Sequence, residues 1–247
     1  MKTLALFFLA AMGAAYAPIA LAQSSCSSDG SVQPVTVFER FINADCAACW
    51  ADARTPAPSS ADTVVLDWIV PAASGDDAPL SAAARPEALA RLQALGRTVP
   101  TETDVHVATV PTRNTTARSS LPLRVAHGLP FNDFIGTAIA LQPPQQQRQR
   151  TGRGAMPNVL RYHLLLVETV PAGSDGTAVE RQIVRNALEG RWDLTGTGRN
   201  NTSRKPASEM RPMNIPVGAQ AERLRVVGWV ETADGQLVTA AQSTCAQ

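Results

Sequence analysis

The first half of the chain alternates between apolar β-branched runs and segments with helical spacing. Leu89, Leu92 and Leu95 share one face at helical spacing and predict a helix over 80–97, with Pro86 suited to its start. Three runs are typical of strands, and they cover residues 35–42, 63–70 and 103–110. A short helix is expected after the first strand, ending before Pro56.

The second half of the chain is richer in strands and turns. Two further strands are expected over 121–128 and 131–141, followed by a low-complexity basic stretch, P-P-Q-Q-Q-R-Q-R-T-G-R-G. Residues 158–170 predict a long strand, 179–188 either a strand or a short helix, and 190–212 a loop. A hairpin with an Asp234-Gly235 turn is expected to join 224–230 to 237–241.

These elements predict two domains. We expect an α/β domain over residues 23–142, a linker or exposed loop over 143–157, and a smaller β-rich, sandwich-like domain over 158–247.

Residues 1–22 predict a secretory signal peptide. Lys2 precedes an almost wholly apolar run, and Ala20-Leu21-Ala22 has the small residues of a cleavage site. We therefore expect a periplasmic or secreted protein with no membrane span in the mature chain. The full chain has 22 Lys and Arg against 21 Asp and Glu, so loss of Lys2 leaves no net charge and no electrostatic case for a nucleic-acid partner.

Four cysteines fit an oxidising compartment. They allow three pairings, and we expect Cys46 to bond Cys49 and Cys26 to bond Cys245. The second bond would join two distant parts of the chain, and we expect it to be structural.

The Cys46-Ala47-Ala48-Cys49 motif stands where the first strand gives way to the short helix. Asp45 can cap this helix, whose end supplies N–H groups and partial positive charge that favour thiolate over thiol. A dithiol in this position is typical of a thioredoxin-like redox site. We expect Cys46 to be the attacking thiolate and Cys49 the resolving thiol.

The stretch Glu39 to Trp50, E-R-F-I-N-A-D-C-A-A-C-W, resembles the motif E-L-F-T-S-x-G-C-S-x-C-P of a bacterial secreted thioredoxin-like family of unassigned function. Residues 121–128, L-P-L-R-V-A-H-G, are similar to the family's later T-P-x-x-V-x-x-G. The resemblance implies a thioredoxin-like fold for the first domain. It also implies a cis-proline beside the dithiol, at Pro122 or, as second candidate, Pro130.

The departures from the family motif add further candidates. Asp45 replaces a glycine, Trp50 replaces a proline, and Arg40 stands where thioredoxins keep a buried acid. We expect Pro122 and Trp50 to line a substrate groove, and Arg40 and Asp45 to tune the thiolate. The expected function is thiol–disulfide exchange with protein thiols or disulfides, with a possible redox partner protein and no cofactor.

Two alternatives remain open. Cys46–Cys49 could be a permanent disulfide in a non-catalytic periplasmic or surface binding protein. A copper or zinc site formed by these cysteines with His127 is the other alternative, although no metal ligand is assigned.

Overall fold

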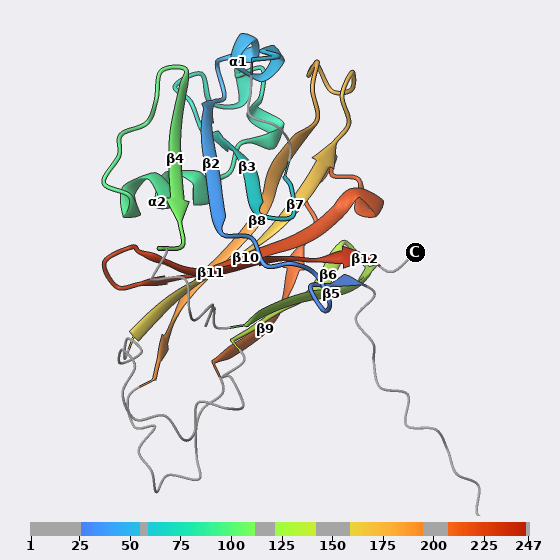
Figure 1. Ribbon diagram of the computed structural model, residues 1–247. Helices are drawn as coiled ribbons and strands as arrows, with labels where there is room; N and C mark the ends of the chain where they lie inside the picture. Colours follow the sequence, from blue (N-terminus) through green and yellow to red (C-terminus); the bar gives the residue numbers. More distant parts are fainter. Residues whose placement is uncertain (1–25, 55–58, 112–121, 142–158, 195–206, 246–247) are drawn as a thin grey trace, which may run out of the picture.

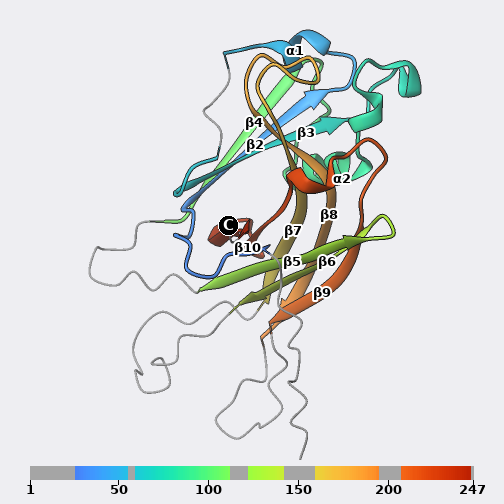
Figure 2. The same cartoon turned by 90° about the vertical axis from the view of Figure 1, so that its right-hand side faces the viewer.

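Two β-sheets form most of the molecule (Figure 1). The computed structural model describes residues 26–54, 59–111, 122–141, 159–194 and 207–245. Figures 1 and 2 show the smaller sheet against one end of the larger sheet, with the short helix α1 (Ala47–Ala51) at the other end.

The larger sheet has seven strands in the order β11-β10-β7-β8-β3-β2-β4. The β2–β3 and β3–β8 pairs are parallel, and the other neighbours are antiparallel. Its strands are β2 (Thr36–Asn43), β3 (Thr63–Val70), β4 (Thr103–Thr109), β7 (Val159–Val170), β8 (Arg181–Asp193), β10 (Leu224–Thr232) and β11 (Leu237–Gln242).

The smaller sheet is antiparallel and has five strands in the order β12-β1-β5-β6-β9. Asn132 and Asp133 form the turn between β5 and β6 with φ of 47° and 61°, a left-handed conformation that these residue types tolerate. The strands are β1 (Cys26–Ser27), β5 (Leu123–Phe131), β6 (Phe134–Leu141), β9 (Ser208–Asn214) and β12 (Thr244–Cys245).

The second helix, α2 (Pro86–Ala94), is shorter than the predicted helix over 80–97. Pro86 disfavours helical backbone at the residue before it, and Arg85 is accordingly extended, with φ of −130° and ψ of 131°. The segment Ser81–Ala83 forms a separate 3₁₀ turn. Gly96, with φ of 67°, follows the end of the helix.

The predicted fold class, an α/β thioredoxin-like domain followed by a smaller sandwich-like domain, is wrong. Strands account for 51% of the structure and helices for 13%, in two sheets with two α-helices among the described residues. Strands β7, β8, β10 and β11 extend the sheet of β2, β3 and β4, whereas β5 and β6 pair with β1 and β9. The local pattern predicts the strands, but long-range pairing decides which sheet each strand joins.

Most predicted elements of the second half are confirmed. Strand β7 and the β10–β11 hairpin lie where the pattern places them, and residues 181–188 of the predicted segment 179–188 belong to strand β8. The loop predicted over 190–212 is partly wrong, because β8 runs to Asp193 and β9 begins at Ser208. The predicted domain boundaries stay a prediction; the signal peptide and the stretch 143–157 lie outside the described residues.

A seam divides the larger sheet between β3 and β8. One residue pair, Asp67 opposite Ile183, forms the parallel bridge. The side chain of Asp67 strengthens this seam, because its Oδ2 accepts a hydrogen bond from the backbone N–H of Gln182 at 3.1 Å. A buried carboxylate therefore adds to the backbone ladder at this point.

The two faces of the larger sheet are covered by different elements. Alternate residues of β10 point to opposite faces, so Val226 and Val230 pack against the smaller sheet while Val227 and Trp229 share a core with α2. A third apolar cluster, which includes Trp50, packs α1 against the end of the sheet. In the described part of the chain no helix is both long and apolar enough to cross a membrane.

Candidate functional site

The candidate site is the Cys46–Cys49 disulfide at the junction of β2 and α1. The predicted pairing is confirmed, and both cysteines are half-buried. Figure 1 shows α1 at the tip of the larger sheet, above the ends of β2 and β3. The local sequence explains this position, because β2 ends at Asn43 and α1 begins four residues later.

Cys46 itself caps helix α1. Its Sγ accepts a hydrogen bond from the backbone N–H of Cys49 at 3.2 Å, so the predicted capping role of Asp45 is wrong. Asp45 is exposed, and its backbone N–H donates to the side-chain oxygen of Asn43 at 2.8 Å. An N–H group directed at a sulfur atom stabilises negative charge on that sulfur.

Arg181, on β8, holds the far end of α1. Its buried guanidinium donates from Nη2 to the backbone carbonyls of Trp50 at 2.6 Å and Asp52 at 2.9 Å. These carbonyls belong to the last turn and the end of the helix, where intrahelical partners are missing. Burial lowers the pKa of Arg181 from its ordinary value, and the neighbouring charge of Arg40 lowers it further.

Trp50 belongs to a buried apolar cluster against which Cys49 packs. It is 5% exposed, its Nε1–H donates to the backbone carbonyl of Asp175 at 2.6 Å, and the Arg181 guanidinium lies 5.3 Å from its ring centroid. Asp175 belongs to the β7–β8 loop, which lies beside α1 in Figures 1 and 2. The structure thus makes Trp50 part of the support of the disulfide, and its predicted role in a substrate groove stays a prediction.

Arg40 forms a buried ion pair with Asp67 on the neighbouring strand. Its Nε donates to Asp67 Oδ1 at 2.6 Å, and the two residues lie directly opposite each other in the β2–β3 ladder. Nη1 of Arg181 lies 4.0 Å from the same carboxylate oxygen. Asp67 therefore compensates two buried arginines, and direct tuning of the thiolate by Arg40 stays a prediction.

The structure does not bring Pro122 and the dithiol together. Pro122 precedes β5 of the smaller sheet, which lies at the opposite end of the molecule from α1 in both views (Figures 1 and 2). No cis peptide bond occurs within the described ranges, so the bond before Pro130 is trans. The bond before Pro122 involves Leu121, which lies outside those ranges.

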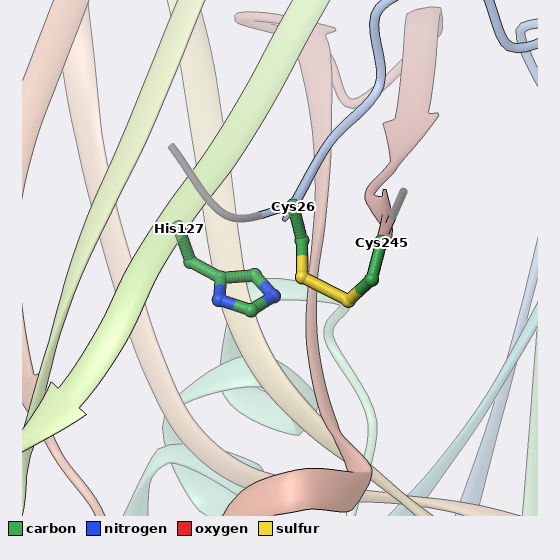
Figure 3. A group of neighbouring side chains, drawn as sticks. All are labelled: Cys26, His127 and Cys245. Carbon is green, nitrogen blue, oxygen red and sulfur yellow. A yellow bond between two sulfur atoms is a disulfide. The ribbon is translucent and has the colours of Figure 1, made fainter. Parts of the chain in front are cut away.

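His127 lies beside the other disulfide. The predicted Cys26–Cys245 bond is confirmed, and Figure 3 shows the imidazole of His127 turned toward its sulfur atoms. Ligand atoms of these three residues all lie within 4.8 Å of one another. Burial lowers the pKa of His127 from its ordinary value, although a hydrogen bond to the backbone of Gly128 opposes this change.

A buried charge network lies between α2 and the larger sheet. Nη2 of Arg91 on α2 donates to Glu39 Oε2 at 2.7 Å and to Glu231 Oε1 at 2.8 Å, and all three side chains are at most 4% exposed. The indole of Trp68 donates to Glu39 at 3.1 Å. The sequence signal that could have found this network is the presence of glutamates within otherwise apolar strand runs.

The same network fixes the protonation of Glu231. Burial by itself raises the pKa of this carboxyl, but the hydrogen bond and charge of His163 and then those of Arg91 lower it well below its usual range. Trp229 also donates to Glu231, at 2.8 Å. Because its carboxylates are hydrogen-bonded to Arg91 and to indole N–H groups, the network acts as a polar part of the core.

Sequence reasoning missed the two supports of the candidate site. Arg181 and Asp67 stand in strands that read as ordinary apolar or amphipathic runs, and only the β3–β8 pairing places them below α1. The sequence also associated His127 with the wrong cysteine pair. An aspartate or arginine inside a buried strand is the signal available, but it does not identify its partner.

The chain matches no known protein-family model, and no curated protein is similar to it in sequence. The resemblance to a secreted thioredoxin-like family therefore stays a prediction that rests on the short motifs quoted above.

Proposed function

We propose that the Cys46–Cys49 pair carries out thiol–disulfide exchange with protein substrates in an exported compartment. The observation that supports this most is the position of Cys46, half-buried at the start of α1 with the N–H of Cys49 directed at its sulfur. This arrangement favours a thiolate at Cys46 once the disulfide is reduced.

The exchange proceeds in two steps that balance. The Cys46 thiolate attacks one sulfur of a substrate disulfide, which forms a mixed disulfide and releases the other substrate sulfur as a thiolate. The Cys49 thiolate then attacks the Cys46 sulfur, so the second substrate sulfur leaves and the Cys46–Cys49 bond forms. Two electrons pass to the substrate, and the same steps in reverse oxidise a substrate dithiol.

The supporting contacts suit a pair that opens and closes repeatedly. Arg181 and the indole of Trp50 hold α1 through backbone carbonyls, and neither contact uses a sulfur atom. The helix can therefore keep its place when the disulfide opens. The exchange needs no cofactor, because both redox equivalents reside in the two cysteines.

The reduction potential tests this proposal directly. We expect the Cys46–Cys49 pair, measured in Cys26→Ser/Cys245→Ser protein against a glutathione buffer, to have a potential above about −300 mV, because structural disulfides lie below that value. With the same background, Cys49→Ala protein should form a stable mixed disulfide with oxidised glutathione through Cys46.

The matched control is Cys46→Ala, whose remaining thiol at Cys49 lacks the N–H contact made by Cys46. We expect the Cys49 thiol of this variant to react with oxidised glutathione more slowly than the Cys46 thiol of Cys49→Ala protein. A potential below about −300 mV together with equal rates for the two monothiol variants would contradict the proposal.

A second candidate is a non-catalytic binding protein, favoured by exposed apolar side chains near the β5–β6 turn. Phe131 is 77% exposed and Val217 97%, and both line an open hollow of about 470 Å³. Such side chains are typical of contact surfaces. An inert Cys46–Cys49 pair in the tests above would favour this function.

A further inference from the structure

Three neighbouring strands place Cys245, Cys26 and His127 in one row. Cys26 of β1 lies directly opposite Cys245 of β12 and, on its other side, directly opposite His127 of β5. Directly opposite residues of antiparallel strands point to the same face of the sheet. The side chains consequently converge, and Figure 3 shows them facing one another.

The histidine is oriented for ligation. Its Nδ1 lies 2.9 Å from the carbonyl oxygen of Gly128. Because a carbonyl oxygen can only accept, Nδ1 carries the proton and Nε2 has the lone pair. Figure 3 shows the other ring nitrogen, Nε2, directed at the disulfide. A backbone carbonyl that fixes the tautomer in this way is the usual support of a metal-ligating histidine.

The spacing of the three residues suits a small ion. Their ligand atoms lie within 4.8 Å of one another. A tetrahedral zinc ion bonds sulfur at about 2.3 Å and nitrogen at about 2.0–2.1 Å, so its ligand atoms are roughly 3.5–4 Å apart. The sulfur atoms need only separate from bonding distance to that spacing. Cys26 and His127 are buried, whereas Cys245 is exposed, which leaves one side of the site open to solvent.

We propose that reduction of the Cys26–Cys245 disulfide creates a zinc site formed by the two thiolates and Nε2 of His127. An external dithiol supplies two electrons, the S–S bond breaks, and the reductant becomes a disulfide. Cys26 and Cys245 are then thiols, and zinc binding releases their two protons to solvent. A water molecule completes the tetrahedron at the exposed side, as in zinc sites with three protein ligands.

Backbone contacts that do not involve the disulfide hold the ligands in place. The N–H of Ser28 donates to the carbonyl of Val125 at 2.9 Å, which fixes β1 on β5. The N–H of Ser243 donates to the carbonyl of Val226 at 2.9 Å, which fixes the segment before β12 on the larger sheet. The row of ligands therefore persists when the covalent bond opens.

The experiment uses Cys46→Ser/Cys49→Ser protein, so that only the Cys26–Cys245 pair is present. The protein is reduced with a phosphine, freed of reductant without oxygen, and titrated with Zn²⁺ against a chromophoric chelator. We expect one zinc ion per reduced chain and none per oxidised chain, with a higher melting temperature of the reduced protein when zinc is present. Equal zinc binding by the two redox forms would overturn the proposal.

Substitution of the histidine identifies the third ligand. We expect His127→Ala and His127→Gln each to lower the zinc affinity of the reduced protein by at least about tenfold. The matched control, His106→Ala, changes a histidine of β4 in the larger sheet and should leave the affinity unchanged. Co²⁺ bound in place of zinc reports the thiolate ligands through its thiolate-to-metal absorption. Unchanged zinc affinity in His127→Gln protein would overturn the assignment, and so would loss of this Co²⁺ absorption in His106→Ala protein but not in the His127 variants.

Discussion

Arg181 donates a hydrogen bond to the backbone carbonyl of Trp50 at 2.6 Å, across 131 residues of chain. This contact ties the helix that carries the dithiol to the strand β8 beyond the seam of the larger sheet. The helix has five residues and would be unstable alone, so its order depends on such tertiary contacts.

Loss of this contact should loosen α1. We expect Arg181→Met to lower the free energy of unfolding by roughly 3 kcal/mol, because buried carbonyls lose a charged donor. Urea unfolding measures the change, and amide hydrogen exchange should quicken within residues 47–51. Arg191→Met, at an exposed position of the same strand, is the control and should change little. A smaller effect at Arg181 than at Arg191 would refute this role.

The two disulfides should differ in their contribution to stability. The Cys26–Cys245 bond spans 219 residues and the Cys46–Cys49 bond spans 3. In the chain-entropy model, removal of the long-range bond should cost roughly 5 kcal/mol and removal of the short-range bond about 2 kcal/mol. Urea unfolding of the two Cys→Ser double variants tests this order. Equal losses in the free energy of unfolding would show that loop length does not determine how much each disulfide stabilises the protein.

The buried network should make stability depend on pH. The pKa of Glu231 is lowered in the folded protein, so its contribution is full above the ordinary glutamate pKa of about 4.3 and declines as the pH falls below it. Glu231→Gln removes this titration. We expect the stability difference between wild type and Glu231→Gln to be about 1–2 kcal/mol smaller at pH 3 than at pH 7.

Urea unfolding at both pH values gives this difference. Acids outside this buried network are shared by the two proteins, so their contributions cancel from the comparison. A stability difference that stays constant, or that grows as the pH falls, would contradict the effect assigned to Glu231.

The two sheets approach closely at Gly228 of β10. A Cβ added there would lie 2.8 Å from Val125 and 2.9 Å from Ile139, both from the smaller sheet. We expect Gly228→Ala to destabilise the protein by about 1–3 kcal/mol through overpacking. Gly136→Ala in β6 is the control, since its Cβ would meet nothing within 4 Å. Thermal unfolding compares the two, and equal melting temperatures would disprove the close approach.

The sequence predicts local structure here better than it predicts architecture. The apolar run over 63–70 becomes β3 with the same bounds, because hydrophobic period and flanking turn residues act locally. The partners of β3 cannot be predicted in this way, since the parallel bridge to β8 joins residues more than a hundred positions apart. The resulting sheet is the reason that the predicted fold class is wrong.

At the candidate site, too, the sequence predicts the local features but not the contacts between distant parts of the chain. Both disulfide pairings are predicted from the cysteine spacing and the expected oxidising compartment, and both are confirmed. The residues around the two disulfides cannot be predicted in this way. Arg181 reaches α1 only through the pairing of strands in the larger sheet, and His127 reaches Cys26 only through the β1–β5 register. Side chains that act through tertiary contacts leave no local pattern in the sequence.

The Cys26–Cys245 bond also determines how the molecule would respond to force. Tension applied through the segments outside the two cysteines passes along the covalent bond between β1 and β12, so neither sheet bears the load. Once that bond is reduced, the 219-residue separation between the cysteines becomes extensible and can lengthen the chain by roughly 700–800 Å. The redox state of a single bond thus decides whether the fold is shielded from stretching or directly exposed to it.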